Sequence, residues 1–458
     1  MSKKIRLFIL FFCAVCFFGA APVLVAYSMG YRFDFNTLKV KATGGIYVRT
    51  FPVAESITID SKIITKPWIF SNATFVQSLL PKTHTVSVKK TGYHDYYKTL
   101  PVKENQVTKL ENVFLIKKSL AYTSIADAVS YFSIAPDNQN IITAGLGTNS
   151  INLNYFNLNN PNSLKKIPIP ETGKILEIKW SENSNKSLIK IQNAGTVFYY
   201  YLDSAEQTPV ATRLPYLDKN SQQINFNPSN NLEIFYVENQ ILYSLENGKP
   251  SAVLKNIVSY KIHNGSILWI PSQGAPNKSD ITGKNTTAMA KSVLNPDYFN
   301  YADYRIETVG DKIFFINPDS LLAYDSASDS IGEIYIDLKN YKMLVSPDGK
   351  NMIYYNDNKI YLFPDGTKKY EELFSGSKIN GLQWLNNDYI IFTTGNNVKI
   401  SEIDYRGNIN IVTLPSSANI APGEVIQINN PAIFFIRHSG ILYLLTGNSL
   451  LASEKITP

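Results

Sequence analysis

The sequence predicts an almost entirely β chain with one membrane helix at its start, and three observations lead to this fold class. An uncharged apolar run lies close to the N-terminus. Tyr, Phe, Ile and Asn are abundant, and apolar residues alternate with polar ones in many short segments, as in half-buried strands. From residue 119 to residue 458, a hairpin-and-turn pattern recurs about every 40 residues, which is typical of a β-propeller.

Length and charge bound the classes of protein that need to be considered. The chain has 458 residues and a formal net charge of +7. Lys3, Lys4 and Arg6 supply three of these charges, and no long Lys/Arg tract follows. A nucleic-acid partner is therefore not expected, because such proteins carry a concentrated basic surface.

Residues 7–26, LFILFFCAVCFFGAAPVLVA, are predicted to form a transmembrane signal-anchor helix. Twenty residues make about 30 Å of helix, which matches the hydrocarbon core of a bilayer. The basic residues place residues 1–6 in the cytoplasm and the bulk of the chain outside it, by the positive-inside rule. A cleaved signal peptide is the alternative, although neither Leu24-Val25-Ala26 nor Gly19-Ala20-Ala21 makes a good cleavage site. Cys13 and Cys16, the two cysteines of the chain, are expected to be apolar residues of this helix.

Residues 27–43 are predicted to be a juxtamembrane linker, and residues 44–118 a small β-sandwich. In GGIYVRTFPVAESITID, Ile46, Val48, Ile57 and Ile59 alternate with polar residues, and Val86 and Val88 do so later. A region of this length with about five short strands and no helical period fits two small packed sheets.

This region resembles the bacterial PEGA domain. The resemblance rests on Phe51-Pro52, Ile57-x-Ile59-Asp60, Leu80-Pro81-x-x-His84-x-Val86-x-Val88 and Thr91-Gly92-Tyr93. Ser61 and Lys82 stand where the family usually has glycine, so strain is expected if either residue has a positive φ. The resemblance implies an extracytoplasmic binding or spacing module, with no catalytic residues to transfer.

The segment 119–458 contains eight hairpin units that align on single turn residues. These are Pro136, Glu182, Pro228, Asn264, Gly310, Pro347, Asn386 and Asn430, spaced by 46, 46, 36, 46, 37, 39 and 44 residues. The clearest unit is SPDGKNMIYYNDNKIYLF, which begins at Ser346. The pattern predicts eight blades, with seven as the alternative, and is similar to TolB-type and WD-repeat-like propellers.

Motifs for reactive chemistry are not found in the sequence. Asp348 and Gly349 are interpreted as a turn, because the other ligands of a calcium loop are missing. The four histidines lack zinc-site spacing; His84 is expected to be structural, and His263 and His438 to lie at hairpin turns. No catalytic residue, metal or cofactor is predicted.

The segment from Ser272 to Tyr304 is the largest departure from the repeat. Its aromatic residues either form an exposed binding patch or belong to an outer strand that packs on its neighbour. The candidate binding residues are Tyr298, Phe299, Tyr301 and Tyr304.

Three functions follow from this organisation. The first is a membrane-anchored extracytoplasmic binding or scaffold protein, in which a propeller face recognises an envelope polysaccharide or protein. The second is an extracytoplasmic hydrolase or lyase with its site in the propeller channel. The third is a purely structural surface component. The absence of a reactive motif favours the first function and a protein that is not an enzyme.

Overall fold

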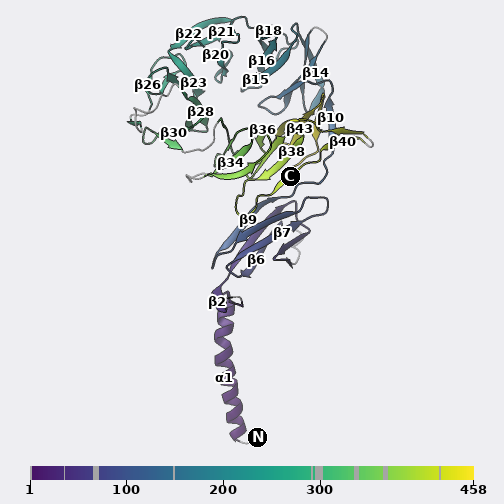
Figure 1. Ribbon diagram of the computed structural model, residues 1–458, viewed down its shortest axis with the longest axis vertical. Coiled ribbons are helices and arrows are strands. Elements are labelled where there is room, and N and C mark those ends of the chain that lie inside the picture. The colour runs from purple at the N-terminus through teal and green to yellow at the C-terminus, as the bar shows by residue number, and fades with distance from the viewer. Residues whose placement is uncertain are drawn as a thin grey trace.

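In the computed structural model, one helix, a small β domain and a large ring of sheets follow one another along the long axis (Figure 1). The structure describes residues 3–35, 37–64, 72–147, 150–289, 292–293, 303–334, 340–364, 370–421 and 424–457. The helix α1 spans Lys3–Ser28, includes Pro22, and is the one helix among these residues that is long and apolar enough to cross a membrane. Protein covers almost none of it, as expected for a helix that faces lipid or is a signal sequence.

A short antiparallel hairpin follows the helix. Its strands are β1 (Tyr31–Asp34) and β2 (Lys39–Ala42). The Thr43 N–H donates to Gly30 O at 3.0 Å, and the Asn105 N–H donates to Thr43 O at 3.1 Å. The base of the hairpin is therefore fastened both to the end of the helix and to the small domain.

The small domain is a sandwich of two sheets. One sheet has the order β6-β3-β9 and the other the order β5-β4-β7-β8. The strands are β3 (Gly44–Phe51), β4 (Ser56–Ile59), β5 (Lys62–Ile64), β6 (Ala73–Leu79), β7 (Thr83–Lys89), β8 (Tyr96–Pro101) and β9 (Val107–Phe114). The predicted alternation is confirmed, since Ile46, Val48, Ile57, Ile59, Val86 and Val88 are all buried between the sheets.

Eight antiparallel sheets of about four strands each, together with one separate two-stranded hairpin, make up the rest of the described strands. The first sheet contains β11 (Tyr131–Ile134), β12 (Asn140–Leu146), β13 (Ile151–Asn157) and β14 (Asn160–Ile169), and the second contains β15 (Lys174–Trp180), β16 (Lys186–Asn193), β17 (Thr196–Asp203) and β18 (Ala211–Arg213). The third sheet contains β19 (Gln222–Asn227), β20 (Asn230–Glu238), β21 (Ile241–Glu246) and β22 (Lys249–Lys255). The fourth contains β23 (Ile257–His263), β24 (Ser266–Pro271), β25 (Asn277–Asp280) and β26 (Thr287–Ala288).

The other four sheets complete the ring. The fifth sheet contains β28 (Arg305–Val309), β29 (Lys312–Ile316), β30 (Leu321–Asp325) and β31 (Ser330–Ile334), and β27 (Ser292–Val293) pairs with β31 in parallel. The sixth contains β32 (Lys342–Val345), β33 (Asn351–Tyr355), β34 (Lys359–Pro364) and β35 (Glu371–Ser375), and the seventh contains β36 (Ile379–Trp384), β37 (Tyr389–Thr394), β38 (Asn397–Glu402) and β39 (Ile411–Thr413). The eighth contains β42 (Ala432–Ile436), β43 (Ile441–Thr446), β44 (Ser449–Ser453) and β10 (Tyr122–Ala126).

Hydrophobic clusters join each sheet to the next around the ring. Eight clusters of the described residues lie between consecutive sheets, and one of them joins the last sheet to the first. The first strands of neighbouring sheets contact one another, as β23 does β28 and β36 does β42, so these strands form the inner edge of the ring. The fold is a β-propeller, and β10 closes it by pairing with β44 from the other end of the chain.

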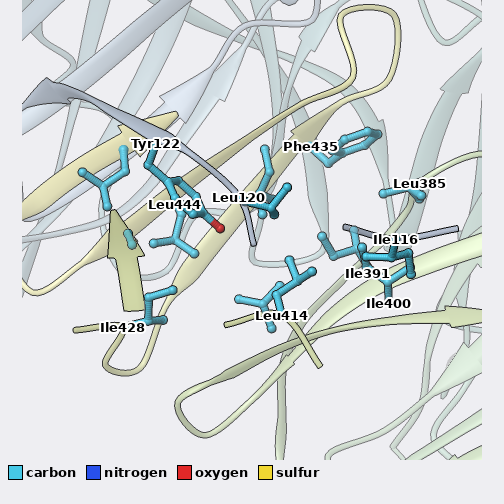
Figure 2. Packing of buried hydrophobic residues seen from close by; sticks show 14 of the residues in the cluster. Ile116, Leu120, Tyr122, Leu385, Ile391, Ile400, Leu414, Ile428, Phe435 and Leu444 are labelled. Atoms are coloured by element: carbon cyan, nitrogen blue, oxygen red, sulfur yellow. The ribbon is translucent and has the colours of Figure 1, made fainter. Parts of the chain in front are cut away.

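The cluster between the last two sheets also receives the chain that arrives from the small domain. Figure 2 shows Ile116 and Leu120 of this connecting segment among Leu385, Phe435 and other buried residues of the two sheets. Because the connecting segment is part of the core of the ring, it does not act as a free linker between two domains.

The turn interpretation of SPDGK is confirmed. Gly349 has a φ of 73°, and Asp348 Oδ1 accepts hydrogen bonds from Ser346 Oγ at 2.6 Å and from the Lys350 N–H at 3.2 Å. Ile353, Ile360 and Leu362 of the hairpin are buried between two sheets.

One predicted repeat position is wrong. Asn430 precedes β42, whereas the turn equivalent to the other seven lies between β42 and β43, around Gly440. An additional hairpin, formed by β40 (Ser417–Ala421) and β41 (Glu424–Gln427), lengthens the preceding connection. This insertion displaced the last position of the sequence alignment.

Candidate functional site

A cavity of about 820 Å³ opens at the inner edge of the ring. Its walls are the ends of three consecutive first strands, β32, β36 and β42, together with the turns that follow them. Asn138, from the turn after β11, adds the fourth consecutive sheet. Mouths of propeller channels and other concave sites between repeated elements are the usual places for ligands.

The cavity wall combines basic, amide and aromatic side chains. Arg437 and His438 are exposed in the β42–β43 turn, and no carboxylate partner is found for Arg437 among the described residues. The described residues that line the cavity include no Asp or Glu; they are Asn138, Leu344, Val345, Pro347, Leu382, Gln383, Trp384, Leu385, Asn386, Asn387, Phe434, Phe435, Arg437, His438 and Thr457. Arg437 is therefore the one side chain among these lining residues that carries a permanent charge.

Gln383 fixes two of these strands relative to each other. Its Oε1 accepts the Phe435 N–H at 2.7 Å, and its Nε2 lies 3.5 Å from Ile433 O. A side chain that replaces backbone pairing in this way keeps β36 and β42 at a constant separation where the cavity opens.

The turn between β36 and β37 separates the cavity from the small domain. Leu385, Asn386 and Asn387 line the cavity, whereas Asp388 faces a second pocket between the ring and the small domain. Burial raises the pKa of the Asp388 carboxyl, although a hydrogen bond with Asn112 of the small domain opposes this shift. Tyr389, the next residue, accepts the Phe114 N–H through its Oη at 3.0 Å.

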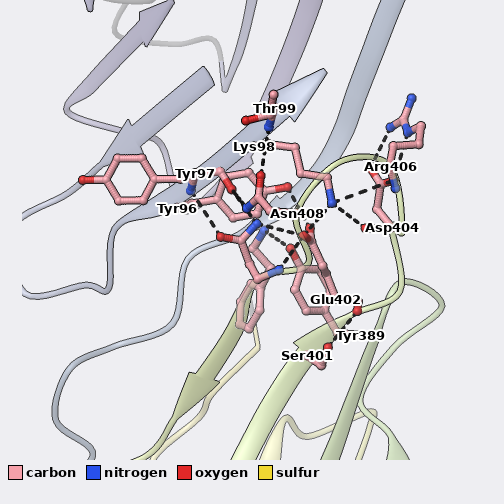
Figure 3. Close-up of polar contacts among 12 residues, drawn as sticks. Tyr96, Tyr97, Lys98, Thr99, Tyr389, Ser401, Glu402, Asp404, Arg406 and Asn408 are labelled. Atoms are coloured by element: carbon pink, nitrogen blue, oxygen red, sulfur yellow. Dashed lines mark hydrogen bonds and ion pairs between the residues drawn. The ribbon is translucent and has the colours of Figure 1, made fainter. Parts of the chain in front are cut away.

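The joint between the two domains is centred on a buried ion pair (Figure 3). Lys98 Nζ of β8 lies 2.7 Å from Glu402 Oε1, and the side chains are 0% and 3% exposed. Glu402 also accepts hydrogen bonds from the Tyr96 Oη at 2.7 Å and from the Asn410 N–H at 2.8 Å. Lys98 donates a further hydrogen bond to Asp404 O. Both charges are thus well satisfied inside the protein, which is the condition under which a buried pair is tolerated.

Asparagine side chains pair with the edge of β8 in the same joint. The Thr99 N–H donates to Asn408 Oδ1 at 3.0 Å, and the Tyr97 N–H donates to Asn410 Oδ1 at 3.2 Å. The Nδ2 atoms of Asn408 and Asn410 return hydrogen bonds to Tyr97 O at 2.6 and 2.8 Å. These amides satisfy backbone groups that an edge strand would otherwise leave open.

Arg406 and Asp404 enclose the outer side of the ion pair. Arg406 Nη2 lies 2.7 Å from Asp404 Oδ2, and it also donates to Lys109 O of the small domain at 2.9 Å. Burial alone would raise the pKa of Asp404, but Arg406 and Lys98 hold it below its usual value.

His84 is structural, as predicted, and its ring is buried more deeply than the sequence indicates. Its Nδ1 lies 2.6 Å from Asp60 Oδ2 and its Nε2 lies 2.8 Å from Leu80 O, with 3% of the side chain exposed. Asp60 Oδ1 accepts the Thr85 N–H at 3.0 Å. Burial raises the pKa of Asp60, but these hydrogen bonds outweigh that effect and lower it overall. The pair ties the β4–β5 turn to β7.

Of the aromatic candidates, Tyr298, Phe299 and Tyr301 lie outside the described residues. Tyr304 is 6% exposed and packs in the cluster between two sheets, with its Oη 2.5 Å from Ser320 Oγ. His263 ends β23 and His438 follows β42, so both lie at hairpin turns as predicted. Among the described residues, no group of three or more His, Cys, Asp and Glu side chains could hold a metal ion.

Arg437 and His438 were not predicted as a site. The sequence places them in a hairpin turn, but their approach to Asn138 depends on closure of the ring. The one local feature of the sequence that could have indicated this site is an Arg-His pair at a turn with no nearby acidic residue.

Comparison with known proteins defines the class of each region. Residues 43–117 match the PEGA domain, so the chain combines a PEGA domain with a β-propeller. The comparison with curated proteins found no match.

Solved structures similar to this chain include β-propeller proteins. Hsv2 of Kluyveromyces lactis is 12% identical, with 63% of this chain and 98% of that chain covered and a TM-score of 0.40. BamB of Moraxella catarrhalis is 13% identical, with 73% and 97% covered and a TM-score of 0.44. The dihydro-heme d1 dehydrogenase NirN is 11% identical, with 73% of each chain covered and a TM-score of 0.44. Identities and scores at this level carry no inference about activity or ligand.

Proposed function

We propose that this protein is a single-pass membrane protein whose propeller stands outside the cytoplasm and binds a polyanionic polymer of the cell envelope. The observation that carries the proposal is the composition of the cavity at the inner edge of the ring. It presents Arg437, His438 and several asparagine amides, and no Asp or Glu is among its lining residues.

The N-terminal region supports the membrane part of the proposal. Within the described residues, α1 is exposed along its length and continues through the predicted apolar run without a break. The basic residues at its start favour a cytoplasmic N-terminus. With an uncleaved α1, the PEGA domain and the ring lie on the opposite side of the membrane.

The cavity suits an acidic saccharide chain. The guanidinium group of Arg437 can bind a carboxylate or phosphate with two parallel hydrogen bonds. Side-chain amides such as those of Asn386 and Asn387 both donate and accept, as sugar hydroxyl groups require. Phe434 supplies an apolar surface in the same wall.

The PEGA domain serves in this proposal as a rigid spacer between the membrane and the ring. Its joint with the propeller contains the buried Lys98–Glu402 pair, and its connecting segment is part of the ring's core. These contacts support a fixed orientation of the cavity relative to the membrane.

No observation favours the hydrolase or lyase alternative. Two carboxylates on first strands of the described ring are beside lysines: Glu307 lies 3.3 Å from Lys261, and Glu177 lies 3.8 Å from Lys179. The pair of Asp or Glu residues that most glycoside hydrolases use is not found among the described cavity residues.

The proposal is tested by titrating the full-length protein in nanodiscs with polygalacturonate, a polymer of carboxylated sugars, and with neutral dextran. We expect polygalacturonate to bind and dextran not to bind. Arg437→Ala should weaken binding about tenfold, because it removes a charged hydrogen-bond donor from the cavity.

Arg213→Ala is the matched control, because Arg213 is another partly exposed arginine of the ring and lies outside the cavity. Its binding should equal that of the wild-type protein. Equal affinity of the Arg437→Ala variant and the wild type would overturn the assignment of the cavity. If the protein does not bind polygalacturonate but captures one envelope protein in a manner that depends on Arg437, the proposed polymer ligand is wrong. The ligand of the cavity is then that protein.

A further inference from the structure

An unusual concentration of exposed apolar side chains lies directly after the membrane helix. Six large hydrophobic residues are exposed within residues 29–40; they are Met29, Tyr31, Phe33, Phe35, Leu38 and Val40. Only thirteen more are exposed in all the described residues from 41 to the end of the chain. A soluble surface does not normally concentrate apolar groups in this way.

The β1–β2 hairpin places Tyr31, Phe33 and Val40 on one face. Phe33 is directly opposite Val40 in the hairpin register. Strand alternation puts Tyr31 on the same side, and the Phe33 and Phe35 rings contact each other edge to face, with their centroids 5.1 Å apart. Phe35 and Leu38 are 81% and 73% exposed at the tip of the hairpin.

The opposite face of the hairpin is charged. Arg32 is directly opposite Lys41, and Asp34 is opposite Lys39. Lys41 Nζ lies 3.0 Å from Asp34 Oδ2, so this face holds an excess of positive charge around one ion pair. An amphipathic element with aromatic residues on one side and basic residues on the other is typical of segments that lie in a membrane interface.

The position of the hairpin relative to α1 is fixed. The Arg32 guanidinium lies over the Tyr27 ring at 3.5 Å and donates to Tyr27 O at 2.7 Å, at the end of the helix. It also donates to Ser78 Oγ of the PEGA domain at 2.9 Å. Figure 1 shows the hairpin beside the end of α1, below the PEGA domain.

The length of the helix sets the depth at which the hairpin lies. The apolar span Ile5–Ser28 has 24 residues, about 36 Å of helix, whereas the hydrocarbon core is about 30 Å thick. A helix of this length brings Tyr27 to the headgroup layer, and the hairpin, which contacts the end of the helix, comes with it.

We infer that the β1–β2 hairpin is a membrane-interface element, in which Tyr31, Phe33, Phe35, Leu38 and Val40 insert into the outer headgroup region of the bilayer. The inference rests on the proposed anchor, because a cleaved α1 would remove the reason for the hairpin to meet lipid. In this arrangement the hairpin holds the PEGA domain at a defined tilt, rather than on a free tether.

The test uses tryptophan fluorescence of the full-length protein in vesicles that contain brominated lipids, which quench only nearby indoles. Three single variants are compared with the wild-type background: Phe35→Trp in the hairpin, Phe18→Trp in α1, and Tyr216→Trp on the ring, where Tyr216 is 50% exposed. We expect the emission added by Phe35→Trp to be quenched about threefold more than that added by Tyr216→Trp, as for a residue at the interface.

The outcomes separate the hairpin from the anchor. Strong quenching of Phe18→Trp without quenching of Phe35→Trp would overturn the hairpin inference and leave the anchor standing. Loss of quenching at both positions would overturn both. A second pair of variants controls for misfolding. Phe35→Ser should leave the thermal unfolding midpoint unchanged, because the Phe35 side chain is exposed. When it is combined with Tyr31→Trp, it should reduce the quenching of the indole at position 31.

Discussion

Ser61 shows how a single residue can depart from the pattern of its domain. The turn between β4 and β5 needs two residues with positive φ, and Asp60 and Ser61 supply φ values of 49° and 65°. A glycine adopts this conformation without strain, whereas a residue with a Cβ does not. The strain expected at Ser61 from the sequence is therefore present, while Lys82, the other departure, does not have a positive φ.

Replacement of Ser61 by glycine should stabilise the protein. We expect Ser61→Gly to raise the free energy of unfolding by about 1 kcal/mol, because it relieves a left-handed conformation. The same change at Ser56, the first residue of strand β4, should lower it, since glycine is unfavourable in an extended strand. Urea unfolding followed by circular dichroism measures both. A destabilised Ser61→Gly variant would show that the serine side chain contributes more than its backbone costs.

The candidate site could be predicted only in part at this scale. The sequence correctly placed His438 in a hairpin turn and Asp348 in a structural turn, because both depend on local turn chemistry. It did not bring Arg437 together with Asn138 or Asn386, which are far apart in the chain and meet only in the closed ring. Local patterns carry no information on such distances.

At the scale of elements, the repeat predicted the hairpins well and the closure of the ring not at all. Seven of the eight turn positions were correct, and the eighth was displaced by the inserted β40–β41 hairpin. Strand β10 could not be assigned, because its partner β44 is more than 300 residues away and its sequence resembles that of any other strand. Pairing of the two ends of a ring is a property of the whole repeat array.

The closing strand offers a test in which the same substitution has opposite effects at two sites. Tyr122 of β10 is 2% exposed, and no hydrogen-bond partner is found for its Oη among the described residues. Burial, with a smaller effect of Glu454, raises its pKa to about 12. Tyr260 is also buried, but its Oη lies 2.7 Å from Gln223 O and 2.9 Å from Phe235 O.

We expect Tyr122→Phe to be neutral or to stabilise the ring by about 1 kcal/mol, because it removes a buried polar atom that has no partner. Tyr260→Phe should destabilise the ring by about 1–3 kcal/mol, because it removes a buried hydroxyl that is hydrogen bonded to backbone carbonyl groups in the core. Denaturant midpoints of the two variants provide the comparison. The interpretation would be wrong if Tyr122→Phe cost as much as Tyr260→Phe.

At the scale of the whole molecule, the joint between the PEGA domain and the propeller is the feature that the sequence did not indicate. Lys98 is one of many lysines in alternating strands, and such residues usually face solvent. Here it is fully buried against Glu402, a residue of another domain. Complementary charges more than 300 residues apart give no local pattern, so the two regions were predicted as separate domains without a fixed relation.

The contacts across the joint lead us to expect that the two domains unfold as one unit, and this gives a prediction for Lys98. Lys98→Ala should destabilise the protein by about 3–5 kcal/mol, because it leaves the buried Glu402 carboxylate without its cation. It should also split a single calorimetric transition into two, as the PEGA domain separates from the ring.

Lys89→Ala is the control, because Lys89 lies in the same sheet, is 51% exposed and pairs with Asp95 at the surface. This variant should leave the transition unchanged. If the two lysine variants behave alike, the ion pair does not hold the domains together, and the hydrophobic connecting segment through Ile116 and Leu120 must do so alone.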